Sequence, residues 1–440
     1  MKREELKERV CSAIDARRDV IIAAAEDIRT HPELGYKEFR TAGIVSDHFS
    51  RLGIDHESGL AITGVKGRLA GRERALTVAY MGELDSIIVP DHPDADPETG
   101  AAHACGHNAQ IANLLGVAYG LVESGIMSEL DGNVALMAVP AEEYVEVEYR
   151  LALKEQGKIE FLGGKPELVR LGAFDDISMA MLTHQASRES GKLSVGAETN
   201  GCVVKMITYI GKAAHAGGAP HRGINALKAA TLGLQAIDMI RETFLDDDHI
   251  RVHPIITRGG DLVNVIPAEV RIETYVRGAS VEAIVAAAEK VDRCLKAGAL
   301  ALGATVHIRT LPGYLPRRPA SALAALYRQN AVELVGDDNW WDSTFGAGST
   351  DMGDISHIMP AIEAQAVGFT GTGHGADYLP LDEETAYITP AKVAAMTLVD
   401  LLADGAEGAR DVLDGFEPAM TKESYLAFMR SLDADLTWQA

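Results

Sequence analysis

Cys105 and His107 are the residues of this chain whose types and spacing most directly suggest metal chemistry. They stand two positions apart in the segment His103–Asn108, just before a helical pattern. In a loop, side chains at positions i and i+2 can converge on one centre. Thiolate with imidazole suits zinc, and imidazole with carboxylate also suits manganese or cobalt. A buried cysteine beside a capping or surface histidine is the simpler explanation of the pair alone, and His103 is a third candidate ligand.

Glu142 and Glu143 are adjacent carboxylates that follow the continuous apolar run Val134–Val139. Carboxylates at the end of a buried strand are costly to desolvate unless they are paired or bound to metal. One of them can bind metal while its neighbour faces a water molecule and acts as general base, because a metal ion lowers the pKa of water towards neutrality. A solvated strand end is the alternative explanation.

Two histidines, His184 and His374, extend the set of candidate ligands. His184 follows the run Ile177–Thr183, where a structural histidine is the alternative. His374 lies in the glycine-rich segment Gly371–Asp377, which an ordinary turn would also explain, although glycines let a backbone approach a ligand closely. Together with Cys105 and the paired glutamates, these histidines supply donors for two ions, with Cys105 or a water molecule between them.

Three further polar residues stand at strand or loop ends in the middle of the chain. His215 is flanked by small residues in Gly211–Gly218. Asn264 lies in Gly259–Pro267, and Arg277 ends the strand that follows. These residues could supply an oxyanion donor, an amide contact and a carboxylate anchor. The alternative for each is a polar residue that closes a strand.

An α/β sheet would bring the candidate residues together at the ends of its strands. Strand-like runs alternate with helical patterns over residues 61–69, 75–81, 134–139 and 177–183, and a helix is expected from Asn108. In such sheets, sites gather at the carboxyl ends of the strands. Glu83 and Asp85 follow the second run. We expect Asp85 to orient a metal-binding histidine, with a strand-end cap as the alternative.

From about Asn200 the pattern changes to β-α-β-β-α-β, the ferredoxin-like arrangement. A compact domain of about a hundred residues of this kind fits an insertion into the first domain. We therefore expect a metal-binding α/β domain from residues 1–199 and 312–440, and an inserted domain from residues 200–311. The expected strands of the insertion are 202–210, 252–257, 270–276 and 305–311, and its expected helices are 223–243 and 281–301.

The composition is that of an ordinary globular protein, and the length of 440 residues suggests two domains. The formal net charge of −23 argues against a nucleic-acid or anionic-membrane surface. The four scattered cysteines do not form a disulfide framework, the first residues lack the apolar core of a signal peptide, and no run approaches transmembrane length. We expect a reducing cytoplasm, which would keep Cys105 available as a thiolate.

The ordered set of motifs resembles the M20 metallopeptidases, specifically the amidohydrolase branch of that family, over nearly the whole length. The resemblance implies a phosphorylase/hydrolase-like catalytic α/β domain with an inserted ferredoxin-like lid that also forms a homodimer. The motifs that carry it are His103–Asn108, Pro140–Glu143, Gly211–Gly217, Asn264–Pro267 and Gly348–Asp354.

The same resemblance implies a role for each candidate residue. Glu142 would be the general base, and His215 would reach the active site of a neighbouring subunit and stabilise the tetrahedral intermediate. Asn264 and Arg277 are placed like substrate-binding residues of the family. Two divalent ions (Mn²⁺, Zn²⁺ or Co²⁺) would be held by Cys105, His107, Glu143, His184 and His374.

Asn108 departs from the pattern of the branch, many of whose members have Asp after the second ligand. With Gly163–Pro166 and Ala173–Asp176, it makes the chain more similar to the aminobenzoyl-glutamate hydrolase and M20 domain-containing dipeptidase group than to auxin-conjugate or hippurate hydrolases. We therefore expect hydrolysis of an amide bond in an N-acyl amino acid, an aminobenzoyl-glutamate-like conjugate or a small dipeptide. The alternatives are a non-catalytic binding protein of this family and a hydrolase of another C–N bond, carbamoyl or amidine.

Overall fold

The computed structural model describes residues 2–73 and 76–440, and the chain divides into two compact units. Unit 1 comprises the chain up to Ala197 together with Arg318–Thr344 and Asp354–Ala419. Unit 2 comprises Glu198–Arg317, Phe345–Gly353 and Met420–Ala440. The expected division placed residues 345–353 and 420–440 in the first domain, whereas they belong to unit 2.

Unit 1 is built on a seven-stranded mixed sheet in the order β1-β2-β6-β3-β7-β14-β8. The central strands β6, β3, β7 and β14 run parallel, so their carboxyl ends lie at one edge of the sheet. Of the run expected over residues 75–81, Ala75 lies outside the described residues and the run overlaps β3. The strands are β1 (Asp55–Leu60), β2 (Gly64–Leu69), β3 (Thr77–Glu83), β6 (Asn133–Val139), β7 (Met179–Gln185), β8 (Leu193–Val195) and β14 (Ala361–Ala366).

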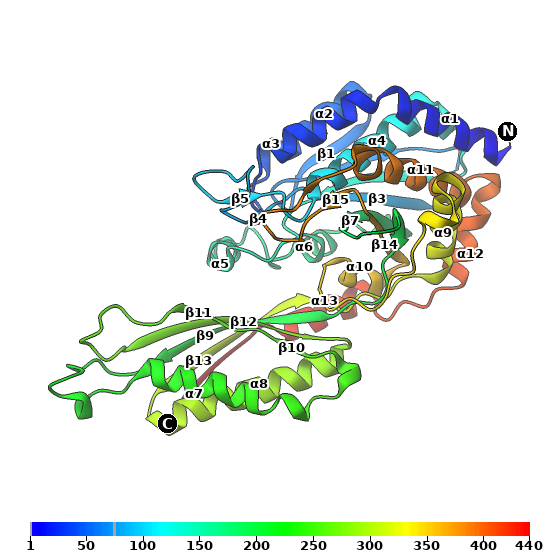
Figure 1. Ribbon diagram of the computed structural model, residues 1–440. Coiled ribbons are helices and arrows are strands. Elements are labelled where there is room, and N and C mark those ends of the chain that lie inside the picture. Colours follow the sequence, from blue (N-terminus) through cyan, green and yellow to red (C-terminus); the bar gives the residue numbers. More distant parts are fainter. Residues whose placement is uncertain (1, 74–75) are drawn as a thin grey trace. The chain divides into compact units, whose positions relative to one another are not determined.

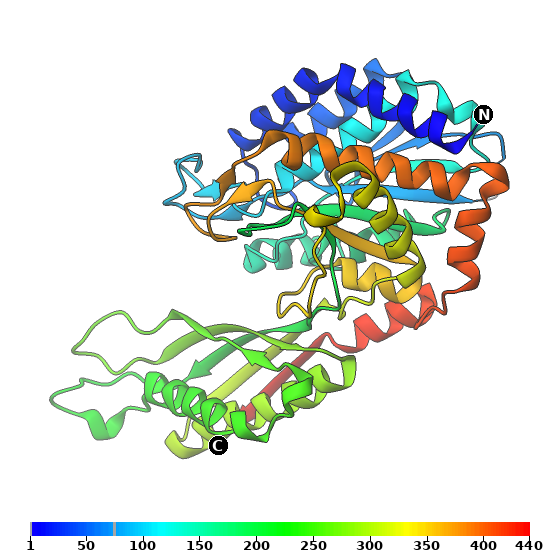
Figure 2. The ribbon, with the colours of Figure 1, turned by 45° about the vertical axis from the view of Figure 1, so that its right-hand side comes forward.

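Helices cover both faces of this sheet (Figures 1 and 2). On one face, α4 contacts α1, α2 and α11 as well as strands β3 and β7, and α1 also contacts α11. Helices α5 and α6 lie across the sheet from them (Figure 1). This arrangement confirms the expected α/β class. The helices of unit 1 named here are α1 (Arg3–Ala16), α2 (Arg18–Arg29), α4 (His107–Glu123), α5 (Val147–Glu155), α6 (Gly164–Leu171), α9 (Ser321–Val335) and α11 (Thr389–Leu402).

Helix α4 is buried from His107 to Leu121, although its sequence predicts one apolar face. The reason is its position between the sheet and helices α1, α2 and α11, which leaves no side for solvent. Small residues permit this packing: a Cβ at Gly116 would lie 2.7 Å from the Cβ of Ala391 in α11. Burial on all sides fixes the first residue of the helix, His107, close to the carboxyl ends of the strands.

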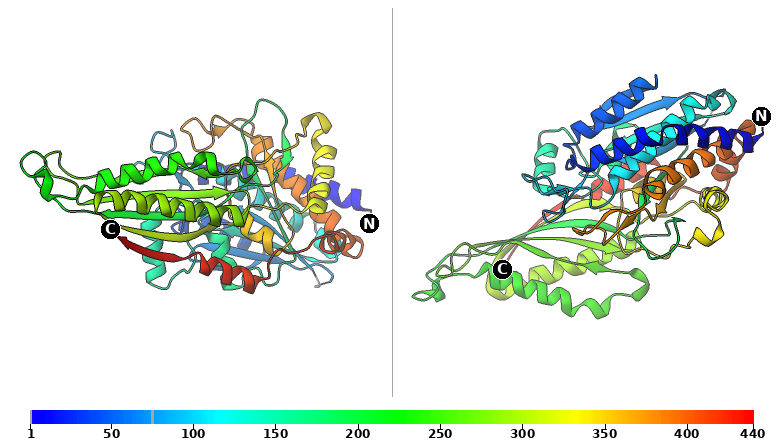
Figure 3. Two further views of the ribbon diagram at one scale, coloured as in Figure 1. Left: turned by 90° about the horizontal axis from the view of Figure 1, so that it is seen from below. Right: turned by 45° about the horizontal axis from the view of Figure 1, so that its top comes forward.

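Unit 2 contains an antiparallel sheet in the order β10-β12-β9-β13-β17, with β11 paired to β12. Helices α7 (Ala226–Met239) and α8 (Val281–Leu302) pack side by side on one face of it (Figures 1 and 3). The order of these elements along the chain confirms the ferredoxin-like arrangement. The strands are β9 (Gly201–Ile210), β10 (Arg251–Val252), β11 (Ile255–Arg258), β12 (Glu269–Gly278), β13 (Thr305–Tyr314) and β17 (Ala434–Gln439).

The sheet of unit 2 differs from the sequence prediction in two places. The strand expected over residues 252–257 is split into β10 and β11, because Pro254 between them has no N–H to donate to the ladder. Strand β17 is an unexpected addition at the end of the chain. It pairs with β13 and forms an edge of the sheet (Figure 3), which explains why residues 420–440 belong to unit 2.

Helix α11 lies within the helical segment Glu384–Leu402. Among the described residues, no single helix combines the length and the apolar composition needed to span a membrane. The segments Glu384–Leu402 and Asp404–Asp414 meet that test only as a pair, and they are bent by 68° where they join. Residues of α11 are buried against α1, α4 and α9.

Candidate metal centre and its surroundings

The loop that precedes α4 carries Cys105 and His107. Cys105 is 8% exposed, and His107 is fully buried. Gly106 between them has a φ of 82°, a left-handed conformation that glycine adopts without strain. A Cβ at this position would also lie 2.9 Å from the Cβ of Gln185 at the end of β7. Glycine is therefore needed at the turn between the two candidate ligands.

Buried polar groups fix the backbone of the turn that carries Glu142 and Glu143. Ala141 has a φ of 53°, which is uncommon for a residue with a side chain. Its N–H donates to Oε1 of Glu38 at 2.8 Å, and burial raises the pKa of the Glu38 carboxyl to about 7. Arg150, fully buried, donates to the carbonyls of Ala141 and Glu143. The backbone is thus held on both sides of Glu142.

We expect Arg150→Met to destabilise unit 1 by about 3 kcal/mol, because buried carbonyls would lose a charged donor. Besides the two carbonyls of the turn, Arg150 donates to the carbonyl of Leu162 at 2.8 Å. Urea denaturation measures the change in the free energy of unfolding. Arg72→Met is the control: Arg72 is exposed and paired with Asp131, so its loss should change the free energy of unfolding far less. Equal stability of the two variants would contradict the role of Arg150.

Side chains far apart in the sequence meet at the carboxyl ends of the strands. Sγ of Cys105 lies 3.3 Å from Nε2 of His184 and 3.4 Å from Nε2 of His374. The same nitrogen of His374 is 3.2 Å from Oε1 of Glu143. Ligand atoms of Cys105, His107 and His184 form one group within 4.8 Å of one another, and those of Cys105, Glu143 and His374 form a second. The thiol of Cys105 belongs to both groups.

Asp85, just beyond the end of β3, holds the ring of His107. The backbone carbonyl and Oδ1 of Asp85 are 2.9 and 3.1 Å from Nδ1 of His107. Nδ1 must therefore carry the proton, which leaves Nε2 as the coordinating atom. Oδ2 of Asp85 accepts the N–H of Glu143 at 2.8 Å. One buried carboxylate thus orients a histidine and a glutamate of the cluster.

Glu142 lies beside the two ligand groups that share Cys105 and belongs to neither. Its Oε2 is 3.9 Å from Nε2 of His107, which is too far for a direct hydrogen bond and is a separation that a water molecule can bridge. Only 8% of Glu142 is exposed. A buried carboxylate at this distance is placed to exchange a proton with a water molecule at the cluster.

The chemistry of the donor set fits divalent metal ions. Burial and the neighbouring Glu143 raise the pKa of the Cys105 thiol well above its usual value, and a cation would reverse this effect. Nε2 of His107 is a buried atom without a hydrogen-bond partner among the described residues, as expected of an atom reserved for a metal. The separations of 3.2, 3.3 and 3.4 Å are close to the roughly 3.3–3.6 Å expected between ligands of one tetrahedral ion.

Glu83 and Lys165 adjoin the cluster, although the sequence pattern did not assign them. Oε2 of Glu83 is 3.0 Å from Nε2 of His107, and Glu83, His107 and Glu142 form a third group of potential ligands. Oε1 of Glu83 pairs with Nζ of Lys165 at 2.5 Å. An acidic residue at the end of a buried strand was visible in the sequence. Its partner, 82 positions away on another element, was not.

In unit 2, backbone pairing brings the segments of His215 and Asn264 side by side. An isolated β-bridge joins them, and the N–H of Ala216 donates to the carbonyl of Asn264 at 2.9 Å. Both predicted residues are exposed. Nδ1 of His215 accepts the N–H groups of Gly217 and Gly218 at 3.2 and 2.9 Å. The ring proton is therefore on Nε2, which is free to act as a donor to a ligand.

Arg277 lies in β12 and contacts the motif segment Gly348–Asp354. Its Nη1 donates to Oγ of Ser349 at 2.9 Å, and its guanidinium lies 5.2 Å from the ring centre of Tyr275. These contacts hold a half-buried arginine in one orientation. The predicted carboxylate anchor and the start of the motif segment therefore share one location in unit 2.

Two residues of the motif around Cys105 have different surroundings from the ligand candidates. His103 is buried, burial lowers its pKa to about 3, and it belongs to none of the ligand groups found among the described residues. Asn108 is buried in α4, and its Nδ2 donates to the carbonyl of Ala25 in α2 at 3.3 Å. Asn108 therefore joins two helices of unit 1.

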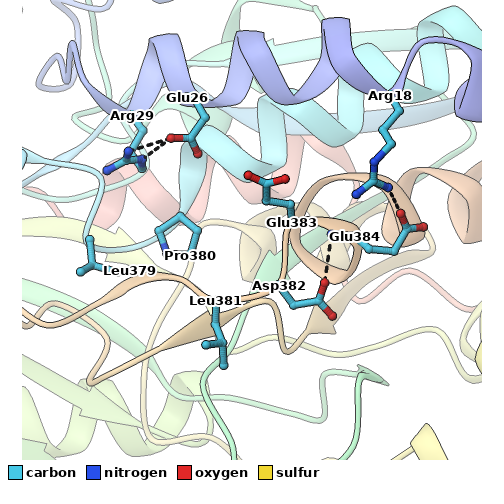
Figure 4. A pocket seen from close by; sticks show the side chains of 9 residues that line it. All are labelled: Arg18, Glu26, Arg29, Leu379, Pro380, Leu381, Asp382, Glu383 and Glu384. Carbon is cyan, nitrogen blue, oxygen red and sulfur yellow. Dashed lines mark hydrogen bonds and ion pairs between the residues drawn. The ribbon is translucent and has the colours of Figure 1, made fainter.

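A pocket of about 630 Å³ in unit 1 is lined by none of the predicted site residues (Figure 4). Within it, Arg18 pairs with Glu384 and Arg29 pairs with Glu26. Because these charges satisfy one another, we assign no ligand to the pocket. Its lining consists of Arg18, Glu26, Arg29, Leu379, Pro380, Leu381, Asp382, Glu383 and Glu384.

Comparison with known proteins shows what the chain is similar to. Residues 201–301 match the M20 peptidase dimerisation domain. The chain is 29% identical over 431 residues to the Xaa-Arg dipeptidase of Mus musculus, covering 92% of each protein. It is 26% identical over 321 residues to an N-acyl-L-amino acid amidohydrolase of Geobacillus stearothermophilus, covering 70% of this chain and 80% of that one.

A solved structure shares the fold. A dinuclear metal-binding peptidase of the M20 family from Bacillus subtilis superposes with a TM-score of 0.66 and 21% identity, over 88% of this chain and 99% of that one. This similarity confirms the fold expected from the sequence motifs, and the relatives confirm the expected family. The chain is therefore similar along most of its length to peptidases and amidohydrolases, and residues 201–301 match the dimerisation domain of M20 peptidases.

Proposed function

We propose that this protein is a metal-dependent hydrolase that cleaves the amide bond of a small dipeptide, an N-acyl amino acid or an aminobenzoyl-glutamate-like conjugate. Relatives named as a dipeptidase and an amidohydrolase support this reaction class. The observation that carries the proposal is the convergence, at the carboxyl ends of parallel strands, of Cys105, His107, Glu143, His184 and His374, with Glu142 beside them.

Two divalent ions would be held by the two ligand groups that share Cys105. Thiolate, imidazole and carboxylate ligands suit Zn²⁺, Mn²⁺ or Co²⁺. When bound, such ions polarise a carbonyl and lower the pKa of water. Because the shared ligand is a thiolate that must escape oxidation, we place the protein in the reducing cytoplasm.

Glu142 would act as the general base. Its carboxylate takes a proton from a water molecule that attacks the amide carbon, and then passes that proton to the leaving amine nitrogen. The nearly complete burial of Glu142 limits competition from bulk water. Glu38 and Arg150, which hold the backbone of its turn, keep the carboxylate in place during both transfers.

The residues of unit 2 would bind the substrate. Nε2–H of His215 would donate to the oxygen of the tetrahedral intermediate, in the active site of the partner subunit of a dimer. Arg277, held by Ser349, would bind a substrate carboxylate, and Asn264 would contact the amide group. A dipeptide or an acyl amino acid has the carboxylate and the amide group that these three residues would bind.

We expect His215→Ala to lower kcat by about 10²–10³-fold, the usual effect of removing one oxyanion donor. The metal content and KM should change little, because His215 is not a metal ligand and acts on the transition state. Steady-state kinetics and elemental analysis measure these quantities. His307→Ala is the control, since His307 is an exposed histidine of β13 that contacts Thr437. A kcat for His215→Ala within threefold of that control would exclude the proposed role.

We also propose that the protein is a homodimer formed through unit 2. The match to a dimerisation domain over residues 201–301 supports this assembly. Strand β11 is an edge strand whose residues are all exposed, among them Ile255 and Ile256. An exposed apolar edge of this kind favours pairing with a second chain. Sedimentation velocity should show a species of twice the mass of the chain.

The proposed function is tested by assaying the purified protein, reconstituted with Mn²⁺, Co²⁺ or Zn²⁺, against a panel of substrates. The panel contains Xaa-Arg dipeptides, N-acyl amino acids and aminobenzoyl-glutamate, and mass spectrometry identifies the products. Release of the free amino acid is the expected result. A protein that binds metal and cleaves none of the panel would contradict the proposal.

A further inference from the structure

The segment Gly163–Pro166 has no part in the chemistry described so far, yet it packs directly on the turn of the general base. The N–H of Gly164 donates to the carbonyl of Ala141 at 3.1 Å. A Cβ at Gly164 would lie 1.6 Å from the carbonyl oxygen of Pro140, so no other residue fits there. This close approach directs the next residue, Lys165, into the interior, where it is fully buried.

The ammonium of Lys165 meets the carboxylate of Glu83. Nζ of Lys165 is 2.5 Å from Oε1 of Glu83, and both residues are buried. Gln110, one turn along α4 from His107, donates to Oε2 of Glu83 at 2.6 Å and accepts the N–H of Glu83 at 3.2 Å. Two contacts from two elements thus hold the Glu83 carboxylate in one orientation, and the third fixes the backbone of Glu83.

In that orientation, Glu83 faces the coordinating nitrogen of His107. Oε2 of Glu83 lies 3.0 Å from Nε2 of His107, and Nε2 has no hydrogen-bond partner among the described residues. Because Nδ1 carries the ring proton towards Asp85, Nε2 has no hydrogen to donate to this carboxylate. Two ligands of one ion with bonds of about 2.1 Å stand about 3.0–3.4 Å apart. The separation fits neighbouring positions around a single ion.

The charges of the region also fit an anionic Glu83. The ammonium of Lys165, 2.5 Å from Oε1, compensates the negative charge of the buried Glu83 carboxylate. Buried charges need compensation. Two divalent ions and Lys165 would bring positive charge into this region. Acidic side chains of the region would balance that charge, namely Glu83, Asp85, Cys105, Glu142 and Glu143.

We propose that Glu83 is a further ligand of the metal centre, next to His107, and that Lys165 is the positioning residue that holds its carboxylate there. The proposal rests on the proposed function, because it concerns the same ions. It also gives the Gly163–Pro166 motif a role: the motif places the Lys165 ammonium beside the carboxylate of Glu83. It also makes Glu83 a group that sets how tightly the ion on the side of His107 is bound.

The test compares metal binding in three variants. Glu83→Gln combined with Lys165→Met removes both charges and so avoids an unpaired buried charge. Lys165→Met alone keeps the proposed ligand. Lys66→Met is the control, because Lys66 is another buried lysine of unit 1, which donates to the carbonyl of Ala173 at 2.7 Å and pairs with Asp176. Each protein is loaded with Co²⁺, and its affinity is measured by chelator competition and its coordination by visible absorption.

We expect the double variant to bind one of its two ions at least about tenfold more weakly and to show a changed Co²⁺ spectrum. Lys165→Met should weaken the same ion by less than the double variant does, because the ligand remains but its carboxylate is no longer held, and Lys66→Met should match the wild type. An unchanged affinity and spectrum in the double variant would overturn the proposal, as would equal losses in Lys165→Met and the double variant, which indicate a purely structural ion pair. A wild type that binds no metal would instead refute the proposed function.

Discussion

Glu142→Gln is expected to lower turnover by about 10²–10⁴-fold while both metal ions stay bound. Glutamine keeps the shape of the side chain but cannot take a proton from water. Because Glu142 lies outside both ligand groups that share Cys105, with Oε2 3.9 Å from Nε2 of His107, its charge is not needed to hold those ligands together. Steady-state kinetics measure turnover, and inductively coupled plasma mass spectrometry measures the metal content.

Glu146→Gln is the matched control for this experiment. Glu146 is four positions further along, and its carboxylate accepts hydrogen bonds from Lys37 at 2.7 Å. Its substitution changes the charge of the same region without touching the proposed proton path, so turnover should remain near that of the wild type. Near-normal turnover in Glu142→Gln as well would remove Glu142 from the mechanism.

Cys105→Ser is expected to release at least one metal ion and to abolish most activity with it. The thiol lies 3.3 Å from Nε2 of His184 and 3.4 Å from Nε2 of His374, so one side chain serves both ligand groups. Substitution of a residue that only hydrogen-bonds to a metal ligand already weakens metal binding by about 10–100-fold. Loss of a ligand that both ions share should weaken metal binding by more than this. Chelator competition measures the affinity, and elemental analysis measures the stoichiometry.

Cys294→Ser controls for the loss of a buried thiol. Cys294 is 7% exposed in α8 of unit 2 and belongs to none of the ligand groups of the described residues. Its metal content and turnover should equal those of the wild type. If Cys105→Ser also retained two ions with wild-type affinity, Cys105 could not be the shared ligand.

The sequence was most informative where local pattern decides the structure. Apolar runs that end in Glu142 or His184 predict strands whose carboxyl ends meet, because parallel strands of one sheet present those ends at the same edge. The Cys105–His107 spacing predicts convergence within one loop. The family and the fold followed from the order of these motifs, and the comparisons confirm both.

Features that depend on packing between distant segments could not be predicted from the sequence. Lys165 meets Glu83 only because Gly164 allows α6 to approach the turn at Pro140. Arg150 reads as an exposed helical residue, yet it is buried under the turn that carries Glu142. Strand β17 has alternating exposure and little apolar character, so its place at the edge of the sheet follows from its pairing with β13 alone.

Metal dependence is tested most directly by titrating the metal-free protein with metal and following turnover of its best substrate from the panel at each step. We expect no turnover without metal and a rise in turnover that ends when two equivalents of Mn²⁺, Zn²⁺ or Co²⁺ are bound. Turnover that persists after complete removal of metal would refute the proposed metal-dependent hydrolysis.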